Sequence, residues 1–387
     1  MIRNISIGID VGSSRVRVVV GEFLPGEKNP RIIGVGEAAT GGLRHGYVVD
    51  SAAASESIRE AVAVAERSSG IKIKRAFISV SGMTLKSDIS SGVAIVSKAD
   101  GEVTGLDINK ALDDSEDNLS LGNKKIIHTF PLGFKLDGKE VQGRLEGMHG
   151  NKLEIKALFI TYSSIHLEDL LEAVALAGVE TIDAVASPIA SSHVALTEKQ
   201  KIVGSALVDI GSQTVTLSVF ENGLPAWIHT SSIGGEEITN DIALGLKIPL
   251  EQAESLKLGT VLEDTNGKKL RDIIEARLED IFEYVENDLK KIKRNELLPA
   301  GIVFVGGGAN ISGLEELSKS ILKLPSRVAS TEIFANNKTK LRDPAWFTAL
   351  GLVLSRRDES GYGGGSLSNI FRDLKRGVKS SIKHLMP

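Results

Sequence analysis

Two stretches of the chain share one pattern: an apolar strand, a glycine turn and a strand of alternating character. The first runs over 7–20 and the second over 206–219. After each turn, apolar residues recur with a period of two, which indicates a β-strand. The copies are 199 positions apart, measured from Asp10 to Asp209. A single repeat at this distance predicts two homologous lobes rather than a solenoid.

The rest of the pattern predicts α/β lobes and one region of different character. Apolar residues at helical spacing predict helices over 53–67, 167–177, 270–294 and 313–322. Short apolar runs predict strands over 75–81 and 302–305. Residues 83–162 are more polar and contain Asp-Gly and Gly-Asn turns. We therefore expect an inserted subdomain of strands there, with one or two helices.

The turns of the two copies carry residue types that hold phosphate. Glycine lets backbone N–H groups approach phosphate oxygens, and serine and threonine add hydroxyl donors. The expected phosphate-contacting residues are Gly12, Ser13, Ser14 and Arg15 in one copy and Gly211, Ser212, Gln213 and Thr214 in the other. Asp10 and Asp209 would hold a Mg²⁺ ion through its bound water, since Mg²⁺ keeps several waters. The alternative is a pair of tight turns with aspartate caps.

A third glycine motif follows the strand predicted over 302–305. Gly306, Gly307 and Gly308 precede Asn310 and a predicted helix. Such glycines allow close backbone approach to a planar base, and a helix N-terminus favours phosphate. Neither G-x-G-x-x-G nor G-x-x-x-x-G-K-[ST] is present, which disfavours a dinucleotide-binding or P-loop fold.

The composition of the chain excludes or disfavours several classes of function. The 387 residues exceed a usual single domain, and 42% hydrophobic with 25% charged residues is ordinary for a globular protein. The net charge of −4 gives no global attraction to nucleic acid or anionic membrane. Without cysteine, disulfides and cysteine chemistry are excluded. No signal peptide and no run of 18 apolar residues is expected from this sequence.

The glycine motifs give the chain a family resemblance. Asp10 with Gly12, Asp209 with Gly211 and Thr214, and the triple glycine resemble the phosphate and adenosine motifs of the actin and heat-shock-chaperone ATPase superfamily. Within it, the chain resembles the FtsA family of bacterial cell-division proteins along nearly its whole length. The supporting segments are 41–46, 79–82, 234–243 and 251–257.

The resemblance implies an α/β, actin-like two-lobed fold of duplicated ribonuclease-H-like domains that binds ATP and Mg²⁺. It adds Gly234, Gly235, Glu254 and Lys257 to the nucleotide site, although the last two are also typical of solvated helix residues. The implied divisions are 1–82 with 163–195 and about 340–358 (lobe 1, 1A); 83–162 (insert, 1C); 196–240 with 301–339 (lobe 2, 2A); 241–300 (helical, 2B); 359–366 (linker); and 367–387 (amphipathic helix).

The segment between the lobes departs from the related ATPases. These carry a Glu or Gln that positions the attacking water, whereas here Ser187 occupies the matching place. Serine cannot act as a carboxylate base, and such a group contributes roughly 10²–10⁴-fold to rate. We therefore expect slow or negligible hydrolysis, with ATP mainly locking the lobes together.

The last segment has the pattern of an in-plane membrane helix, with an apolar stripe opposite a cationic face. The residues expected at the membrane are Leu367, Ile370, Phe371, Leu374, Lys375, Val378, Lys379, Ile382 and Lys383. The alternative is a helix that docks on its own body or in a partner's groove. Resemblance to the membrane-targeting tail of FtsA favours an anionic membrane surface.

A basic run over 290–294 lies at the end of a predicted helix. Such a run is usually a solvated face, but the resemblance implies that Lys290, Lys291 and Arg294 receive the acidic C-terminal peptide of FtsZ. We accordingly expect a peripheral protein at the cytoplasmic face of the membrane at the division septum, which polymerises and tethers FtsZ. The alternatives are a pilus-assembly scaffold or a sugar-kinase-like enzyme of the same fold.

Overall fold

A computed structural model describes residues 4–27, 29–141, 143–259, 267–331 and 339–355. The chain forms two compact units. One contains residues up to Lys86 together with Tyr162–Leu354, and the other contains Ser87–Thr161. The expected membrane segment over 367–387 lies outside the described residues.

The first sheet of the larger unit has five strands in the order β11-β6-β1-β2-β3. Their bounds are β1 Ile5–Val11, β2 Arg15–Glu22, β3 Arg31–Ala39, β6 Arg75–Val80 and β11 Glu180–Ala186. Strands β1, β2 and β3 are antiparallel, whereas β1, β6 and β11 are parallel. The central strand β1 is almost wholly buried.

Helices cover both faces of this sheet. The helices are α1 Ser51–Ser69, α3 Ser164–Leu176, α4 Ser187–Ala195 and α10 Phe347–Leu354. A Cβ at Gly36 would lie 2.0 Å from the Ala61 carbonyl oxygen of α1, and one at Gly8 would lie 2.5 Å from that of Ala349 in α10. Gly36 pairs with Val18 and Gly8 with Val19. Because neighbouring strand residues face opposite sides, α1 and α10 pack on opposite faces.

The second sheet repeats the first. Its order is β14-β13-β12-β15-β16, with β12 Ser205–Ile210, β13 Val215–Glu221, β14 Leu224–Ser231, β15 Ile302–Val305 and β16 Ser326–Val328. Strands β12 to β14 are antiparallel, and β12, β15 and β16 are parallel. The predicted duplication is therefore confirmed at the level of topology. Helices α5 Glu198–Val203 and α9 Leu314–Leu322 also belong to this part.

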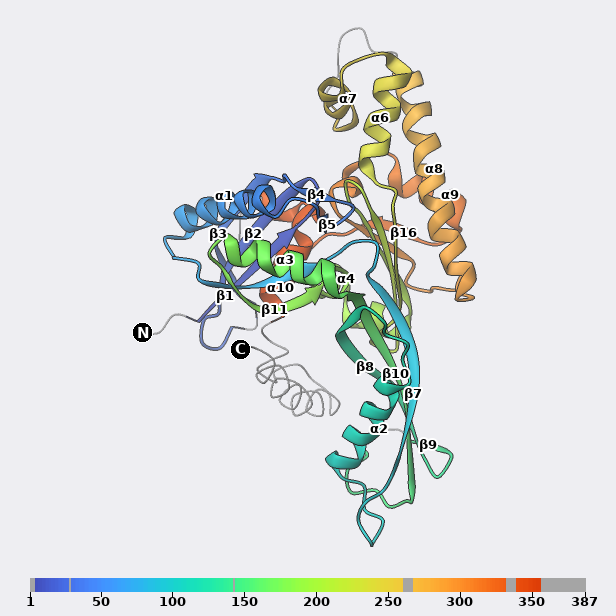
Figure 1. Ribbon diagram of the computed structural model, residues 1–387. Coiled ribbons are helices and arrows are strands. Elements are labelled where there is room, and N and C mark those ends of the chain that lie inside the picture. The colour runs from blue at the N-terminus through green and yellow to red at the C-terminus, as the bar shows by residue number, and fades with distance from the viewer. Residues whose placement is uncertain (1–3, 28, 142, 260–266, 332–338, 356–387) are drawn as a thin grey trace. The chain divides into compact units, whose positions relative to one another are not determined.

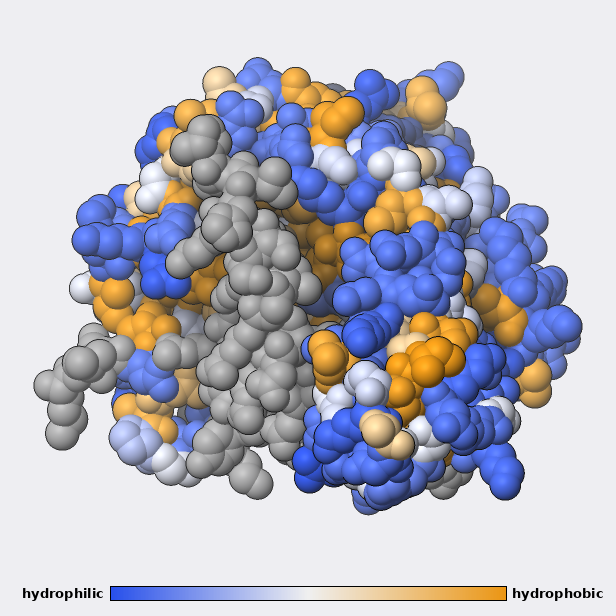
Figure 2. Space-filling model, turned by 60° about the horizontal axis from the view of Figure 1, so that its bottom comes forward, coloured by the Kyte–Doolittle hydropathy of each residue, from blue (hydrophilic) through white to orange (hydrophobic). Residues whose placement is uncertain are grey.

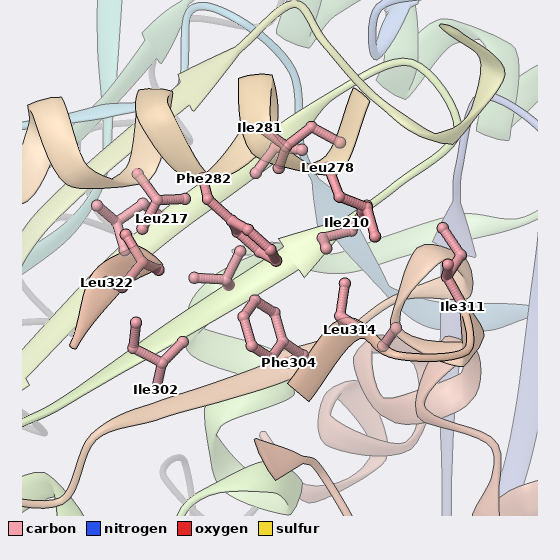
Figure 3. Packing of buried hydrophobic residues seen from close by; sticks show 14 of the residues in the cluster. Ile210, Leu217, Leu278, Ile281, Phe282, Ile302, Phe304, Ile311, Leu314 and Leu322 are labelled. Carbon is pink, nitrogen blue, oxygen red and sulfur yellow. The ribbon is translucent and has the colours of Figure 1, made fainter. Parts of the chain in front are cut away.

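Three helices extend the second sheet: α6 Gly235–Leu246, α7 Leu250–Lys257 and α8 Gly267–Lys291 (Figure 1). The buried face of α8 includes Leu278, Ile281 and Phe282, and the Phe282 and Phe304 ring centroids are 5.8 Å apart (Figure 3). These side chains belong to one apolar core that also takes in β12, β13, β15 and α9. Packing of this amphipathic face holds α8 to the second lobe.

The end of α8 differs from the predicted helix over 270–294. The helix stops at Lys291, and Lys293 adopts a left-handed φ of 58°. The Arg294 N–H donates to the Leu289 carbonyl oxygen at 2.8 Å, and that of Lys293 donates to Lys290 at 3.0 Å. These are the two bonds of a Schellman cap. The expectation that Arg294 sits on the helix is therefore wrong.

The smaller unit is a four-stranded sheet with one helix. The sheet order is β7-β10-β8-β9, with β7 Lys86–Ile95, β8 Lys124–Leu136, β9 Lys139–Val141, β10 Lys152–Ser163 and helix α2 Gly105–Asp117. Asp107 of α2 is buried and accepts bonds from the N–H and hydroxyl groups of both Ser97 and Thr104. These bonds cap α2 and hold the pKa of Asp107 well below its usual range despite burial.

Short elements complete the described chain. They are β4 Leu43–Arg44, β5 Tyr47–Val48 and the 3₁₀ turns η1 Gly307–Asn310, η2 Thr339–Arg342 and η3 Pro344–Trp346. On the face shown in Figure 2, polar residues cover much of the coloured surface, and apolar residues lie in scattered patches. Within the described ranges, no helix is both long and apolar enough to cross a bilayer.

Candidate functional site: two facing phosphate hairpins

The two predicted phosphate turns have the same hydrogen bond at equivalent positions. In the first, the Gly12 N–H donates to the Arg15 carbonyl oxygen at 3.2 Å. In the second, the Gly211 N–H donates to the Thr214 carbonyl oxygen at 2.9 Å. A Cβ on either glycine would stand 3.0 Å from the accepting oxygen. Both turns are therefore tight connections in which glycine relieves crowding.

The aspartates of the two turns lie close enough to affect each other. Burial raises the pKa of Asp209, the Asp10 charge raises it further, and Arg17 lowers it, with a result of about 7. Burial also raises the pKa of Asp10, against the opposing effects of the Ser79 hydrogen bond and Arg17. Two carboxylates that disfavour each other's charge form a site that gains from a cation.

Asp10 has two neighbours that the sequence reasoning did not assign to the site. The Ser79 hydroxyl of β6 donates to Asp10 Oδ1 at 2.7 Å. Arg17 pairs with Asp10 across the β1–β2 ladder, and its Nε lies 3.1 Å from Glu37 Oε1. Ser79 belongs to a segment that carries the family resemblance, and the strand alternation places Arg17 opposite Asp10. Those two signals could have identified them.

The triple-glycine segment packs directly against the second hairpin. Gly306 has a φ of 85°, and a Cβ there would lie 2.2 Å from Asp209 Oδ1. A Cβ at Gly308 would lie 2.3 Å from Ile210 Cγ2. Gly307 begins η1, which ends at Asn310, and the Asn310 amide donates to Asp343 at 2.9 Å. The structure thus brings the adenosine-like motif beside the second phosphate turn.

Gly234 and Gly235 lie against the same turn at the start of α6. The Gly235 N–H donates to the Gly211 carbonyl oxygen at 2.9 Å, and the Glu236 N–H donates to that of Ser212 at 2.7 Å. A Cβ on Gly234 would be 2.4 Å from the Ser212 oxygen. The N-terminus of α6 is consequently held at the hairpin, where its dipole favours an anion.

Glu254 and Lys257 of α7 join this group through α6. Lys257 Nζ lies 2.9 Å from the Gly235 oxygen, 2.8 Å from Thr239 Oγ1 and 2.6 Å from Glu254 Oε2. The Lys257 side chain is only 10% exposed, so it is not a solvated lysine. Its ammonium lies next to the second phosphate hairpin. Thr239, which bonds both side chains, was absent from the sequence-based site.

Ser187 is the first residue of α4, directly after β11. It is buried, and its carbonyl oxygen accepts the Ser191 hydroxyl at 2.9 Å. Pro188 follows at a position where a helix tolerates proline. The local sequence therefore makes a strand-to-helix junction at Ser187, and its assignment to the water-positioning place stays a prediction.

The three predicted peptide-binding cations already have acidic neighbours. Lys290 Nζ is 2.8 Å from Glu286, and Lys291 Nζ is 2.8 Å from Asp288. Arg294 holds Glu221 through both Nε and Nη2. Lys290 and Lys291 also line a groove of about 610 Å³ between the end of β14 and the C-terminal half of α8. The structure places these two lysines at a groove, and Arg294 in a pair at the end of the helix.

The fold is that of known actin-like proteins. Solved structures of similar fold include the PilM–PilN type IV pilus biogenesis complex, with a TM-score of 0.67, 18% identity and coverage of 90% of this chain and 98% of that one. MreB5 of Spiroplasma citri bound to ADP has a TM-score of 0.54, 13% identity and coverage of 93% and 99%. The two sheets and facing hairpins thus define an actin-like ATPase fold.

Sequence comparisons identify the family. The model for cell division protein FtsA matches residues 206–351, and that for the SHS2 domain inserted in FtsA matches 82–161. The FtsA of Bacillus subtilis strain 168 is 33% identical over 90% of this chain and 82% of its own length. The FtsA of Borreliella burgdorferi is 27% identical over 99% and 98%. The chain belongs to the FtsA family of cell-division proteins.

Proposed function

We propose that this chain is an ATP-binding, self-assembling protein that tethers FtsZ to the cytoplasmic membrane at the division septum. The observation that carries the proposal is the pair of equivalent glycine hairpins, brought together with the triple glycine and with Lys257, whose side chain is mostly covered. Family membership supports the role in division. Titration with a fluorescent ATP analogue tests the first step, and absence of saturable binding would contradict it.

The residues present fit a Mg²⁺ ion. Asp10 and Asp209 have raised pKa values, and the charge of Asp10 disfavours that of Asp209. Oxygen ligands with retained water are what Mg²⁺ prefers. When bound, Mg²⁺ would supply positive charge that offsets these carboxylates and the phosphates. Asp10 and Asp209 would hold its water shell, while the turn residues hold the phosphate oxygens.

We propose that bound ATP mainly holds the two lobes together and that its hydrolysis is slow or negligible. Ser187 supplies no carboxylate at the water-positioning place, so little acceleration from a general base is expected. Single-turnover measurement with radiolabelled ATP checks this directly. A hydrolysis rate typical of metabolic kinases, on the order of 1–100 s⁻¹, would contradict the proposal. Ser187→Glu is the informative variant, since a gain in rate would support the assigned position.

The proposed FtsZ contact uses the cations at the end of α8. An acidic peptide would exchange with Glu286 and Asp288 as partners of Lys290 and Lys291. Arg294 would have to release Glu221. The double variant Lys290→Glu, Lys291→Glu should weaken binding of an FtsZ C-terminal peptide at least tenfold, measured by fluorescence anisotropy. The double variant Lys319→Glu, Lys323→Glu at the exposed end of α9 is the charge-matched control, and equal losses in both double variants would refute the site.

The proposed membrane contact uses the segment over 367–387. Its apolar stripe and cationic face are features of the sequence, and each Lys or Arg near anionic lipid contributes about 1 kcal/mol. Co-sedimentation with anionic liposomes should fall strongly when the chain is truncated at Gly361. Undiminished binding by the truncated chain would refute the anchor.

One experiment tests the assembled function. Electron microscopy of the protein with ATP on anionic lipid, with and without FtsZ, should show filaments and recruitment of FtsZ. Absence of both would leave only a nucleotide-binding protein of this fold. The pilus-assembly and sugar-kinase alternatives have no supporting observation beyond a shared fold.

A further inference from the structure

A short β-hairpin between β3 and α1 contacts both phosphate turns. Strands β4 and β5 pair Leu43 with Val48 and Arg44 with Tyr47, which leaves His45 and Gly46 as a two-residue turn. Both have positive φ, 49° and 81°, as the type I′ hairpin turn requires. In such a turn the flanking residues make the ladder bonds, so the N–H groups of the two turn residues point outward.

Those two N–H groups reach one phosphate turn each. The His45 N–H donates to Gln213 Oε1 at 2.8 Å, in the second lobe. The Gly46 N–H donates to Ser13 Oγ at 3.1 Å, in the first lobe. His45 Nδ1 also lies 3.1 Å from the Gln213 carbonyl oxygen. Since a carbonyl oxygen only accepts, the ring must donate through Nδ1–H.

The turn is fixed from behind as well. A Cβ on Gly46 would lie 2.6 Å from Gly82 Cα, so the turn is in close contact with that backbone. The Tyr162 hydroxyl donates to the Ser81 carbonyl oxygen at 2.9 Å and lies 3.4 Å from that of Gly46. The Tyr162 side chain is fully buried. These contacts hold the two N–H groups in place before any ligand arrives.

The bonds determine what Ser13 and Gln213 can offer a ligand. Ser13 Oγ accepts from Gly46, so its O–H is available to donate in another direction. Gln213 Oε1 accepts from His45, so its amide nitrogen keeps its two donors. An anionic polyphosphate needs donors rather than acceptors. The two bonds from the turn therefore occupy acceptor atoms of Ser13 and Gln213 and leave their donor groups for phosphate.

We propose that the His45–Gly46 turn is a latch that joins the two phosphate hairpins and orients Ser13 and Gln213 as donors toward a bound polyphosphate. This inference rests on the proposed nucleotide site and adds positioning residues to it. Because the latch bonds to both lobes, phosphate binding and lobe closure stabilise each other. The alternative is a structural cross-link without influence on the ligand, and the two make different predictions.

The test compares MgATP with adenosine on variants of the full chain. Gly46→Ala forces the turn away from Gly82 and should weaken MgATP about tenfold or more, the size of one lost charge-assisted bond. Affinity for adenosine, which has no phosphate, should change less than twofold. Gly138→Ala is the matched control, because Gly138 has a φ of 78° and open space around its Cβ position.

Two substitutions at His45 cover the case in which Gly46→Ala fails to fold. His45→Gly suits the positive φ and removes only the ring bond, so MgATP should weaken about threefold. His45→Asn also tolerates this φ and keeps a side-chain donor, so it should restore most of the affinity. Hydrogen exchange of the peptide over 41–48 should slow when MgATP binds to the unaltered chain.

The outcomes separate this inference from the proposed function. Failure of the unaltered chain to bind MgATP contradicts both. Normal binding of MgATP with normal affinity in every folded variant overturns the latch alone. Equal losses for MgATP and adenosine also overturn it, since they indicate general damage to the site rather than a role in positioning phosphate-binding groups.

Discussion

Asp10 and Asp209 occupy the same place in two copies of one design, but their neighbours differ. Each is the last but one residue of the central strand of a five-stranded sheet, and the two sheets have the same topology. Asp10 receives a hydroxyl bond from Ser79 of the adjacent parallel strand. At the adjacent parallel strand of the second lobe, Asp209 pairs with Val305. Duplication preserved the backbone but not the chemistry that surrounds each carboxylate.

The residues that pair with the two aspartates on the adjacent antiparallel strands also differ in charge. Arg17 pairs with Asp10, whereas Thr216 pairs with Asp209. Thr216 Oγ1 is 3.0 Å from Thr230 Oγ1 of β14. Asp10 therefore has a hydroxyl donor and a guanidinium beside it, and Asp209 has neither on these two strands. Burial raises the pKa of both aspartates. The Ser79 hydrogen bond opposes this effect at Asp10, whereas the Asp10 charge adds to it at Asp209, whose pKa is about 7.

The largest expected effect comes from the glycine that packs on Asp209. Gly306→Ala places a methyl group 2.2 Å from Asp209 Oδ1 at a φ of 85°. Overpacking and the left-handed strain together should lower the free energy of unfolding by about 3–5 kcal/mol. Urea denaturation measures this. Gly313→Ala is the control, with a φ of 80° and no atom within 4 Å, and an equal loss there would exclude the Asp209 contact as the cause.

The second effect concerns charge and depends on pH. Because the folded pKa of Asp209 is raised, the folded state binds its proton more tightly than the unfolded state. Stability is then lost as the pH rises from about 4 to about 7. In EDTA at pH 8, Asp209→Asn should be more stable than the unaltered chain by about 2–4 kcal/mol.

That gain should disappear below about pH 3, where the Asp209 carboxyl is protonated in both the folded and the unfolded state. Thermal or urea unfolding across the pH range provides the measurement. Asp10→Asn serves as the comparison, because it also loses the charge-assisted bond from Ser79 and should gain less. If the difference in stability between Asp209→Asn and the unaltered chain stayed constant with pH, ionisation of Asp209 would not destabilise the folded protein.

The third prediction removes the feature that distinguishes the first lobe. Ser79→Ala deletes the donor to Asp10 and the acceptor of the Val11 N–H. A hydrogen bond to a charged group contributes about 1.5–3 kcal/mol, so stability at pH 8 should fall by that amount. Ser192→Ala removes a buried hydroxyl whose partner is an Ile189 carbonyl oxygen and should cost less. Equal costs would argue against a special role for Ser79.

The smallest expected effect comes from giving the second lobe the hydroxyl group that the first lobe has beside its aspartate. Val305→Thr adds a hydroxyl beside Asp209, and a donor to the charged form should lower that pKa by about one unit. The pH at which the metal-free protein loses stability should shift down accordingly. Val303→Thr, which pairs with Leu207 away from the carboxylate, should leave this pH unchanged. An identical shift in both variants would contradict the explanation.

Local sequence was sufficient to predict much of the fold and the two turns on which the candidate site is built. The duplicated hairpins follow from period-two alternation around a glycine turn, because both signals act within a few residues. The helices over 51–69 and 314–322 lie close to their predicted ranges, since amphipathic spacing is local as well. The end of α8 was less predictable, because the left-handed position after this helix is occupied by Lys293 rather than by glycine, which is the usual sequence signal of a helix end.

The sequence by itself determined that two equivalent glycine turns exist, that each has an aspartate before its glycine, and that a triple glycine follows a buried strand. Only the tertiary structure decided which side chains stand beside those aspartates. Ser79 and Val305 are separated from them by 69 and 96 positions, and the parallel strand register alone brings them together. The contact from His45 to Gln213 spans 168 positions. Such contacts depend on how the sheets form and how the lobes pack, which no local pattern of residues encodes.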